Sequence, residues 1–326
     1  MIIKNMKFID LFAGIGGFRY ALESFGCKCV FSSECDKFCQ ESYNLNFGDI
    51  PYGDITKIDE KDIPNFDILC GGFPCQPFSV SGKQKGFADT RGTLFFDIVR
   101  IVAYHKPKVI FLENVKNLKA HNGGATFEVI SNTLNELNYN IYYKVLNSKN
   151  FGLPQNRERI TIVCIRKDID NGNFEFPKGS NDFKTIFDIK EDDDKTEKYI
   201  INRTDINIDQ EKLKNAIKNG KVNKPVQIGI IGKGGQGNRI YHENGIGITL
   251  AASSGGAASK TGAYYINGKV RKLSPREAAR LQGFPEEFII IENENQALKQ
   301  FGNSVPISLL KAVFAGLIDM GEKKHE

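Results

Sequence analysis

Asp10-Leu11-Phe12-Ala13-Gly14-Ile15-Gly16-Gly17 is the stretch of sequence that decides the fold. It continues a short apolar run from Lys7, and predicts a buried strand that turns through glycines into a helix reaching about Phe25. Glycines let the backbone approach a ligand closely, and N–H groups at a helix N-terminus bind its acidic parts. The glycine spacing is not G-x-G-x-x-G, which disfavours a nicotinamide or flavin cofactor and hence an oxidoreductase.

The first half of the chain repeats this alternation of strands and helices. Apolar strands are expected over residues 27–31, 67–70, 108–112 and 160–165. Helices are expected from Asp36, over 93–102, and from Thr126 as an N-capping residue. This order predicts an α/β fold with a mainly parallel sheet, in which ligands bind beyond the carboxyl ends of the strands.

The alternation ends near residue 167. Residues 167–224 are polar and rich in charge, and glycines recur from Gly229 to Gly268, which predicts a second and less regular domain. Ser274-Pro275-Arg276-Glu277 predicts a helix start, because serine caps, proline fits the first helical position and glutamate closes a capping box. A last amphipathic helix is expected over 306–317.

The composition is that of a soluble protein with a mildly basic surface. The net charge of +5 and pI near 8.6 suit a nucleic-acid partner. No apolar run approaches the roughly 18 residues of a membrane span, and the polar first residues are not a secretion signal, so we expect a cytoplasmic protein without a membrane partner. Seven cysteines without such a signal indicate free thiols, and their spacings do not fit zinc sites, so we expect no metal.

Two acidic residues are candidate cofactor ligands. Glu34 lies just past the second expected strand, where a carboxylate can accept both hydroxyls of a ribose. Asp54 can accept from an adenine amino group. Each acid taken alone is more often a solvated surface charge; their place at the strand ends favours a functional role for Glu34 and leaves Asp54 open.

Cys75 is the candidate nucleophile. Gly71-Gly72-Phe73-Pro74-Cys75-Gln76 follows a strand directly and forms a stiff, shaped loop, in which nearby cations or backbone donors can stabilise a thiolate. The following segment, 79–86, is basic and bounded by glycine. It is either a mobile surface loop or a lid in which Lys83 and Lys85 contact a phosphate backbone.

Two further strand ends carry polar residues. Glu113 comes at the end of the strand that starts at Lys108, where a carboxyl near a thiol can hold a proton. Arg157 and Arg159 stand two residues apart just before another strand, so both can point toward one substrate. The alternative for the arginines alone is an ordinary basic surface.

Taken together and in order, these segments resemble a known family. Segments 10–17, 72–76, 113–115, 155–159 and 300–305 are similar to the motif set of DNA cytosine-C5 methyltransferases, over nearly the whole chain. The resemblance implies a Rossmann-like fold that binds S-adenosylmethionine, over residues 1–185. It implies a smaller target-recognition domain over 186–270, and a C-terminal segment, 271–326, that returns to the catalytic domain.

The resemblance also implies a chemistry. Cys75 adds to C6 of cytosine, Glu113 contacts N3 and the exocyclic amine and supplies a proton, and Arg159 with Arg157 holds the base and the site. The target base must first be flipped out of double-stranded DNA. No metal is required.

The binding residues implied by the resemblance fall into two sets. The cofactor contacts are Phe12, Gly14, Gly16, Gly17, Glu34, Asp54 and Asn303. The DNA contacts are Gln76, Ser79, Ser81, Lys83, Gln236, Arg239 and Thr249. Gln236 and Arg239 resemble residues with which a family member recognises GCGC, and arginine suits a bidentate guanine contact. After Thr249 the sequence departs from that relative, because segment 251–256 has no aromatic residue.

Two other functions remain to be separated from this one. A tRNA-methylating branch shares the P-C-Q and E-N-V motifs, but its Cys-Phe-Thr signature is not found here. A catalytically inactive DNA-binding module would not need Cys75, Glu113 and Arg159 together. The resemblance further implies a monomer that belongs to a restriction-modification system.

Overall fold

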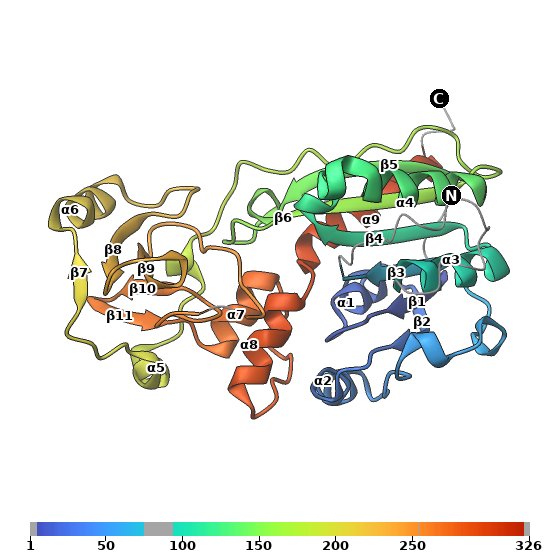
Figure 1. Cartoon of the computed structure of the whole chain (residues 1–326). Helices are drawn as coiled ribbons and strands as arrows, with labels where there is room; N and C mark the ends of the chain where they lie inside the picture. Colours follow the sequence, from blue (N-terminus) through green and yellow to red (C-terminus); the bar gives the residue numbers. More distant parts are fainter. Residues whose placement is uncertain (1–4, 75–93, 254, 323–326) are drawn as a thin grey trace. The chain divides into compact units, whose positions relative to one another are not determined.

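The chain folds into two compact units (Figure 1). The computed structural model describes residues 5–74, 94–253 and 255–322, with the backbone alone for Gln236 and 319–322. Unit 1 comprises Met1–Leu146, Glu158–Pro177 and Leu310–Glu326, and unit 2 comprises Asn147–Arg157 and Lys178–Leu309.

Unit 1 is built on a six-stranded sheet in the order β2-β1-β3-β4-β6-β5 (Figure 1). The strands are β1 (Lys7–Leu11), β2 (Lys28–Ser33), β3 (Ile68–Gly72), β4 (Val109–Val115), β5 (Tyr139–Asn147) and β6 (Glu158–Arg166). The first four strands run parallel, which confirms the predicted α/β class. The sheet is mixed, because β6 pairs antiparallel with β4. The sequence did not predict β5.

Helices cover both faces of this sheet. They are α1 (Gly17–Glu23), α2 (Lys37–Phe47), α3 (Leu94–His105), α4 (Ala125–Glu136) and α9 (Ile307–Glu322). The main core lies on the α3 and α4 side, where Ile110 and Leu112 of β4 are fully buried. On the opposite side, the ring of Phe111 packs edge-on against Phe18 of α1 and Phe314 of α9, at centroid distances of 5.3 and 4.7 Å.

Local signals set both ends of α2. Asp36 caps α2, because its carboxylate accepts the N–H groups of Phe38 and Cys39, and Gly48 ends the helix in a left-handed conformation. The expected N-cap at Thr126 is wrong: α4 starts after Gly124, and the Thr126 hydroxyl instead lies 2.7 Å from Nδ1 of His121. Gly124 has φ 93°, a conformation that favours glycine over threonine at this junction.

Unit 2 contains a five-stranded sheet in the order β11-β10-β9-β8-β7. Its strands are β7 (Ile206–Ile208), β8 (Gln227–Ile231), β9 (Arg239–His242), β10 (Ala263–Ile266) and β11 (Lys269–Lys272). Its helices are α5 (Asp193–Thr196), α6 (Gln210–Asn219), α7 (Pro275–Gln282) and α8 (Glu294–Asn303). A separate apolar cluster, including Ile228, Ile231 and Ile240, forms its core. Neither this sheet nor α6 and α8 was predicted from the sequence.

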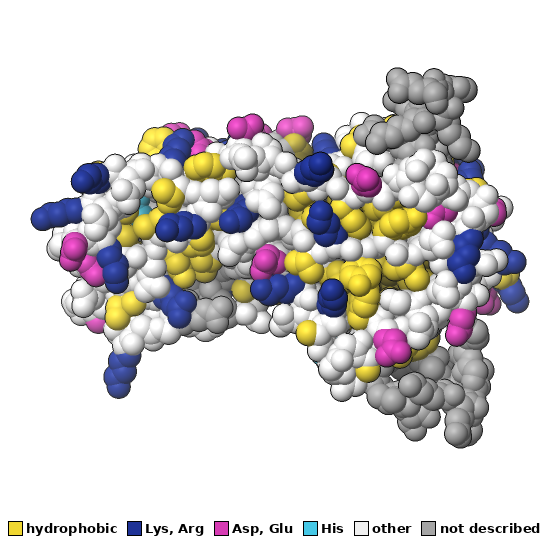
Figure 2. All heavy atoms as spheres, turned by 90° about the horizontal axis from the view of Figure 1, so that it is seen from above, with side chains coloured by type: hydrophobic (Ala, Val, Ile, Leu, Met, Phe, Trp, Pro, Cys, Tyr) yellow, Lys and Arg dark blue, Asp and Glu magenta, His cyan; other side chains and the backbone are white. Residues whose placement is uncertain are grey.

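On the face of the molecule seen from above, basic side chains lie over both units. In Figure 2, Lys and Arg recur on the face seen from above in both units, with Asp and Glu among them. The whole chain has 44 Lys and Arg against 39 Asp and Glu.

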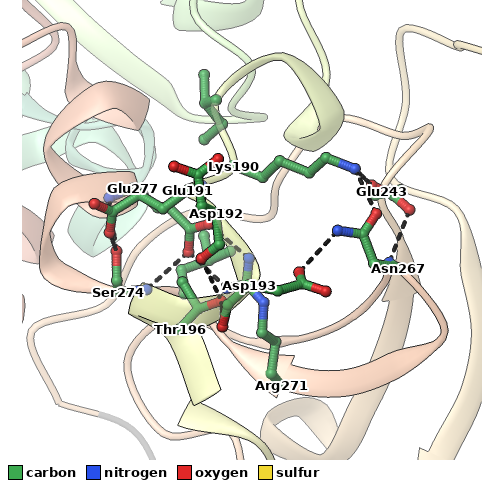
Figure 3. A network of polar contacts seen from close by, with 12 residues as sticks. Lys190, Glu191, Asp192, Asp193, Thr196, Glu243, Asn267, Arg271, Ser274 and Glu277 are labelled. Carbon is green, nitrogen blue, oxygen red and sulfur yellow. Dashed lines mark hydrogen bonds and ion pairs between the residues drawn. The ribbon is translucent and has the colours of Figure 1, made fainter. Parts of the chain in front are cut away.

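A buried polar network fixes the start of α7 (Figure 3). Ser274 and Glu277 form the predicted capping box, with proline at the first turn. Glu277 is fully buried and also binds Arg271 of β11 through two contacts of 2.7 Å. Its Oε1 accepts the N–H of Glu191, and the carboxylate of Glu191 accepts a hydrogen bond from the Ser274 hydroxyl. The network therefore ties α7 to β11 and to the segment that precedes α5.

The two units divide the chain differently from the expected domains. Residues 271–309 belong to the same unit as 178–270, and the chain returns to unit 1 at Leu310, within α9. Among the described residues, one helical stretch, Glu294–Ile318, is apolar enough to cross a membrane by length and composition alone. We expected none, because no single apolar run is long enough. Residues 304–306 divide this stretch into α8 and α9. In its most apolar part 61% is buried inside the protein, as in the core helix of a soluble protein.

Candidate active site

The glycine turn after β1 has the backbone conformation that the sequence predicted. Phe12, Gly14 and Gly16 all have positive φ, of 56°, 55° and 81°, and α1 begins at Gly17. At Gly16 a Cβ would lie 2.2 Å from the ring of Phe47, so both the conformation and the space require glycine. The turn thus brings backbone N–H groups to the carboxyl edge of the sheet, where a ligand can reach them.

Glu34 holds this turn against the end of β2. Its two carboxylate oxygens accept the N–H groups of Gly14 and Asp36, each at 2.8 Å. A carboxylate offers about four lone-pair positions, so about two remain for ligand hydroxyls. Tyr52, which the sequence did not single out, joins the same edge, because its backbone bonds to Ser32 and Glu34.

Asp54 caps a short 3-10 helix, Ile55–Lys57. Its Oδ1 accepts both the hydroxyl and the N–H of Thr56, at 2.8 and 3.1 Å. The hydroxyl bond is the main reason why the pKa of Asp54 lies below its ordinary value. The side chain is therefore ionised at neutral pH, and Oδ2 makes no hydrogen bond with the part of the chain that the structure describes.

Glu113 and Arg159 form an ion pair at the carboxyl end of β4. Nε of Arg159 lies 3.2 Å from Oε1 of Glu113, and the side chains are 14% and 11% exposed. The register explains the contact: Val115 pairs with Arg159 and Glu113 with Thr161, so Glu113 and Arg159 are diagonal neighbours on one face. A carboxyl and a guanidinium so placed can bind the polar edge of a base.

Asn114 connects this strand end to the loop that leads to Cys75. Its buried side chain donates a 2.7 Å hydrogen bond to the carbonyl of Phe73, and Gly72 pairs with Glu113 in the β3–β4 register. The E-N-V segment by itself predicts a role for Glu113 only, and the structure adds one for Asn114. Its place between the glutamate and the valine is the sequence signal for this role.

Arg157 lies in different surroundings from Arg159. It belongs to unit 2, is 1% exposed, and donates to the carbonyls of Leu250, Gly302 and Ser304 at 3.3, 3.1 and 2.7 Å. We expected both arginines to point toward one substrate. The structure uses the Arg157 guanidinium to hold three backbone segments of unit 2.

The predicted recognition residues of unit 2 lie near two glycine-rich segments in the sequence, 232–237 and 255–256. Arg239 starts β9, and its side chain is exposed. The exposed Thr249 donates its hydroxyl to the carbonyl of Asn156 at 2.6 Å. At Gly237 a Cβ would lie 1.9 Å from the carbonyl oxygen of Gly255, so the two segments can meet only because side chains are absent.

The other predicted residues are placed as follows. Cys75, Gln76, Ser79, Ser81 and Lys83 lie outside the described residues. Gln236 begins a short 3-10 helix, Gln236–Asn238, and only its backbone is described. Asn303 is the exposed last residue of α8, in unit 2. Over residues 5–74, 94–253 and 255–322 no group of three or more His, Cys, Asp or Glu could hold a metal ion.

Comparison with known proteins decides the family. The family model for C-5 cytosine-specific DNA methylase matches residues 6–319. The chain belongs to this family. It is similar to the Type II methyltransferase M.HhaI of Haemophilus parahaemolyticus, with 52% identity covering 95% of this chain and 94% of that protein. It is also similar to M.HaeII of Haemophilus aegyptius, with 45% identity over 97% and 94% of the two chains.

Solved structures agree on the fold. The S. pombe Dnmt2 methyltransferase superposes with a TM-score of 0.71 over 98% of this chain and 99% of that chain, at 18% identity. The Entamoeba histolytica methyltransferase EhMeth gives 0.70, over 97% and 99%, at 19% identity. The expected Rossmann-like methyltransferase fold is therefore confirmed.

Membership of the C-5 cytosine-specific DNA methylase family makes the chain a DNA cytosine-C5 methyltransferase, and its cofactor is S-adenosylmethionine. The residues at the sheet edge fit this cofactor. The carboxylate of Glu34 has acceptor capacity left for ribose hydroxyls, and the ionised Asp54 offers Oδ2 for an amino group.

Proposed function

We propose that this methyltransferase acts on a cytosine flipped out of a short duplex site, through a covalent bond between Cys75 and C6 of the base. The observation that carries the proposal is the Glu113–Arg159 ion pair, at 3.2 Å. It lies beside Gly72, three residues before Cys75, and Asn114 fixes the intervening Phe73 carbonyl. The strand that precedes Cys75 in the chain and the strand that carries Glu113 are neighbours in the sheet, and a thiol nucleophile with a nearby acid suits addition to an aromatic ring.

The chemistry starts from the weak nucleophilicity of cytosine C5. Addition of the Cys75 thiolate to C6, with a proton delivered from the Glu113 carboxyl to N3, makes the ring enamine-like and C5 nucleophilic. S-adenosylmethionine, when bound, supplies the electrophilic methyl group. Loss of the C5 proton to a base then re-forms the C5–C6 double bond and expels the thiolate, and N3 loses its proton. Arg159 keeps the Glu113 carboxyl oriented throughout.

Arg157 acts as a positioning residue in this proposal. Its three carbonyl contacts hold the segments of Leu250, Gly302 and Ser304, which flank Thr249 and Asn303. We assign the cofactor contacts to the turn residues Phe12, Gly14, Gly16 and Gly17, to Glu34 and Asp54, and to Asn303.

Base flipping leaves a gap in the duplex, at a cost of a few kcal/mol. We assign Ser81 and Gln236 to the vacated space, and Gln76, Ser79 and Lys83 to the DNA beside it. Arg239 is suited to a bidentate guanine contact because its side chain is exposed at the start of β9. The resemblance of Gln236 and Arg239 to residues with which a family member recognises GCGC supports GCGC as the recognition sequence. We also propose a monomer in the cytoplasm that protects DNA within a restriction-modification system.

The covalent step is tested with duplex DNA that contains 5-fluorocytosine. With S-adenosylmethionine present, C5 is methylated after Cys75 has added to C6. Because the fluorine at C5 cannot then leave as a proton does, the thiolate is not expelled and the protein stays attached to the DNA. We expect a stable adduct with the wild type, none with Cys75→Ser, and methyl transfer to ordinary DNA by the wild type alone. Gel shift under denaturing conditions and labelled S-adenosylmethionine measure the two steps.

Each outcome separates one alternative. Transfer to tRNA but not to DNA would move the chain to the RNA branch. DNA binding without an adduct or transfer would leave an inactive binding module. Undiminished transfer by Cys75→Ser would remove the nucleophile assignment.

The recognition sequence is tested on plasmid from expressing cells. Protection at GCGC sites from a nuclease that methylation blocks is expected. Complete cleavage would exclude GCGC. Arg239→Ala should lose discrimination at one guanine, worth about 1–3 kcal/mol, while non-specific binding persists.

A further inference from the structure

Three polar side chains share one face at the end of β4 and β6. Glu113 pairs directly with Thr161 across the antiparallel register, and Arg159 stands two residues from Thr161 on the same face. Directly opposed residues in such a pair have Cβ atoms about 4.5–5.5 Å apart. The Glu113 carboxyl therefore has Arg159 along one diagonal and the Thr161 hydroxyl straight across.

The Thr161 hydroxyl is buried without a hydrogen bond. Thr161 is 0% exposed, and its Oγ1 has no partner within the described residues. Buried hydroxyls are almost always hydrogen-bonded, so an exception calls for an explanation. Packing alone gives none, because valine has the same shape and would leave no polar atom unpaired.

We propose that Thr161 is a positioning residue for Glu113, and the inference rests on the proton-delivering role proposed for that carboxyl. With a cytosine bound, the Thr161 hydroxyl donates to the carboxyl of Glu113. This bond orients the carboxyl toward N3 and stabilises the negative charge that grows on it as the proton leaves. Arg159 fixes the carboxyl from the diagonal position, and Thr161 fixes it from across the strand pair.

The proposal predicts opposite effects on stability and activity. Thr161→Val removes only an unpaired hydroxyl, so the urea midpoint should stay the same or rise. The rate of adduct formation on 5-fluorocytosine DNA should fall by about tenfold to a hundredfold, the effect of losing one hydrogen bond to a charged group. KM for S-adenosylmethionine and Kd for DNA should stay unchanged, and Thr161→Ser should restore most of the rate.

Thr126→Val is the matched control. Its hydroxyl is also buried, but it is hydrogen-bonded to His121, and neither residue belongs to β4 or β6. This variant should lower the urea midpoint and leave the rate of adduct formation unchanged, the reverse of Thr161→Val.

Two results would overturn the proposal: a Thr161→Val enzyme as fast as the wild type, or a slow one that is equally destabilised and not restored by serine. Failure of the underlying mechanism has a different signature. In that case the wild type forms no adduct, or Glu113→Gln forms it at the full rate, whatever the residue at position 161.

Discussion

At the residue scale, Asp10 is a carboxyl whose burial is only partly compensated. It is fully buried in β1, and neither carboxylate oxygen has a hydrogen-bond partner within the described residues. Burial raises its pKa well above the ordinary 3.8, and the charge of Arg19 offsets only part of this effect. Asp10 lies in β1, two residues before the glycine turn begins at Phe12. Ionising its carboxyl there is costly because the group is shielded from water.

This burial predicts a pH-dependent stability difference for Asp10→Asn. A carboxyl whose pKa is raised on folding stabilises the fold below its unfolded pKa, near 3.8, and loses that contribution as the pH rises through the folded pKa. Relative to the wild type, the asparagine variant should therefore gain stability from about pH 4 upward, to a plateau above the folded pKa. Urea unfolding at a series of pH values measures the difference.

Asp54→Asn is the control for this pH series. The pKa of Asp54 is lowered by its bond to Thr56, so its contribution to stability is lost only on acidification below about pH 4. Above about pH 4, the difference in free energy of unfolding between Asp54→Asn and the wild type should not change with pH. Over the same range the difference for Asp10→Asn should rise. A flat curve for both variants would contradict the burial argument.

At the scale of elements, the start of α7 depends on one buried ion pair. Arg271 and Glu277 are 3% and 0% exposed, and the carboxylate also accepts the N–H groups of Ser274 and Glu191 (Figure 3). The pair thus joins a helix N-terminus to β11 and orders the segment before α5. Breaking such a pair leaves a buried charge without a partner, which costs more than replacing the whole pair.

We expect Glu277→Gln to lower the free energy of unfolding by about 3–5 kcal/mol. The double variant Arg271→Met, Glu277→Leu should be less destabilised than the sum of the two single changes, because no charge is left buried. Urea unfolding of the wild type, of Arg271→Met, of Glu277→Leu and of the double variant closes the cycle. Additive losses would show that the two side chains do not depend on each other.

At the scale of the whole molecule, basic residues outnumber acidic ones. The net charge is +5, and Figure 2 shows basic side chains spread among acidic ones. Binding to the DNA backbone displaces counterions in proportion to the phosphates neutralised, whereas a small cofactor displaces few.

DNA affinity should therefore fall steeply with salt while affinity for S-adenosylmethionine stays nearly constant. The slope of log affinity against log salt should be about −0.9 for each phosphate contacted. Fluorescence titrations with duplex DNA and with cofactor in the same buffers measure both. A DNA affinity independent of salt would argue against backbone contacts by the basic residues.

The sequence by itself determined what depends on neighbouring residues. The strand–glycine turn–helix at residues 7–23, the cap of α2 by Asp36 and the capping box of Ser274 and Glu277 are all present. These features follow from conformations and hydrogen bonds that span two to four residues. The ordered motifs also led to the correct family.

Only the tertiary structure decided what depends on residues far apart in the chain. The antiparallel insertion of β6 between β4 and β5 places Thr161 opposite Glu113, and this register is absent from any local pattern. Arg157 and Arg159 look alike in sequence, yet one guanidinium is buried among carbonyls more than 90 residues away. Strand pairing and burial are set by long-range packing, so spacing along the chain could name these residues but could not assign their partners.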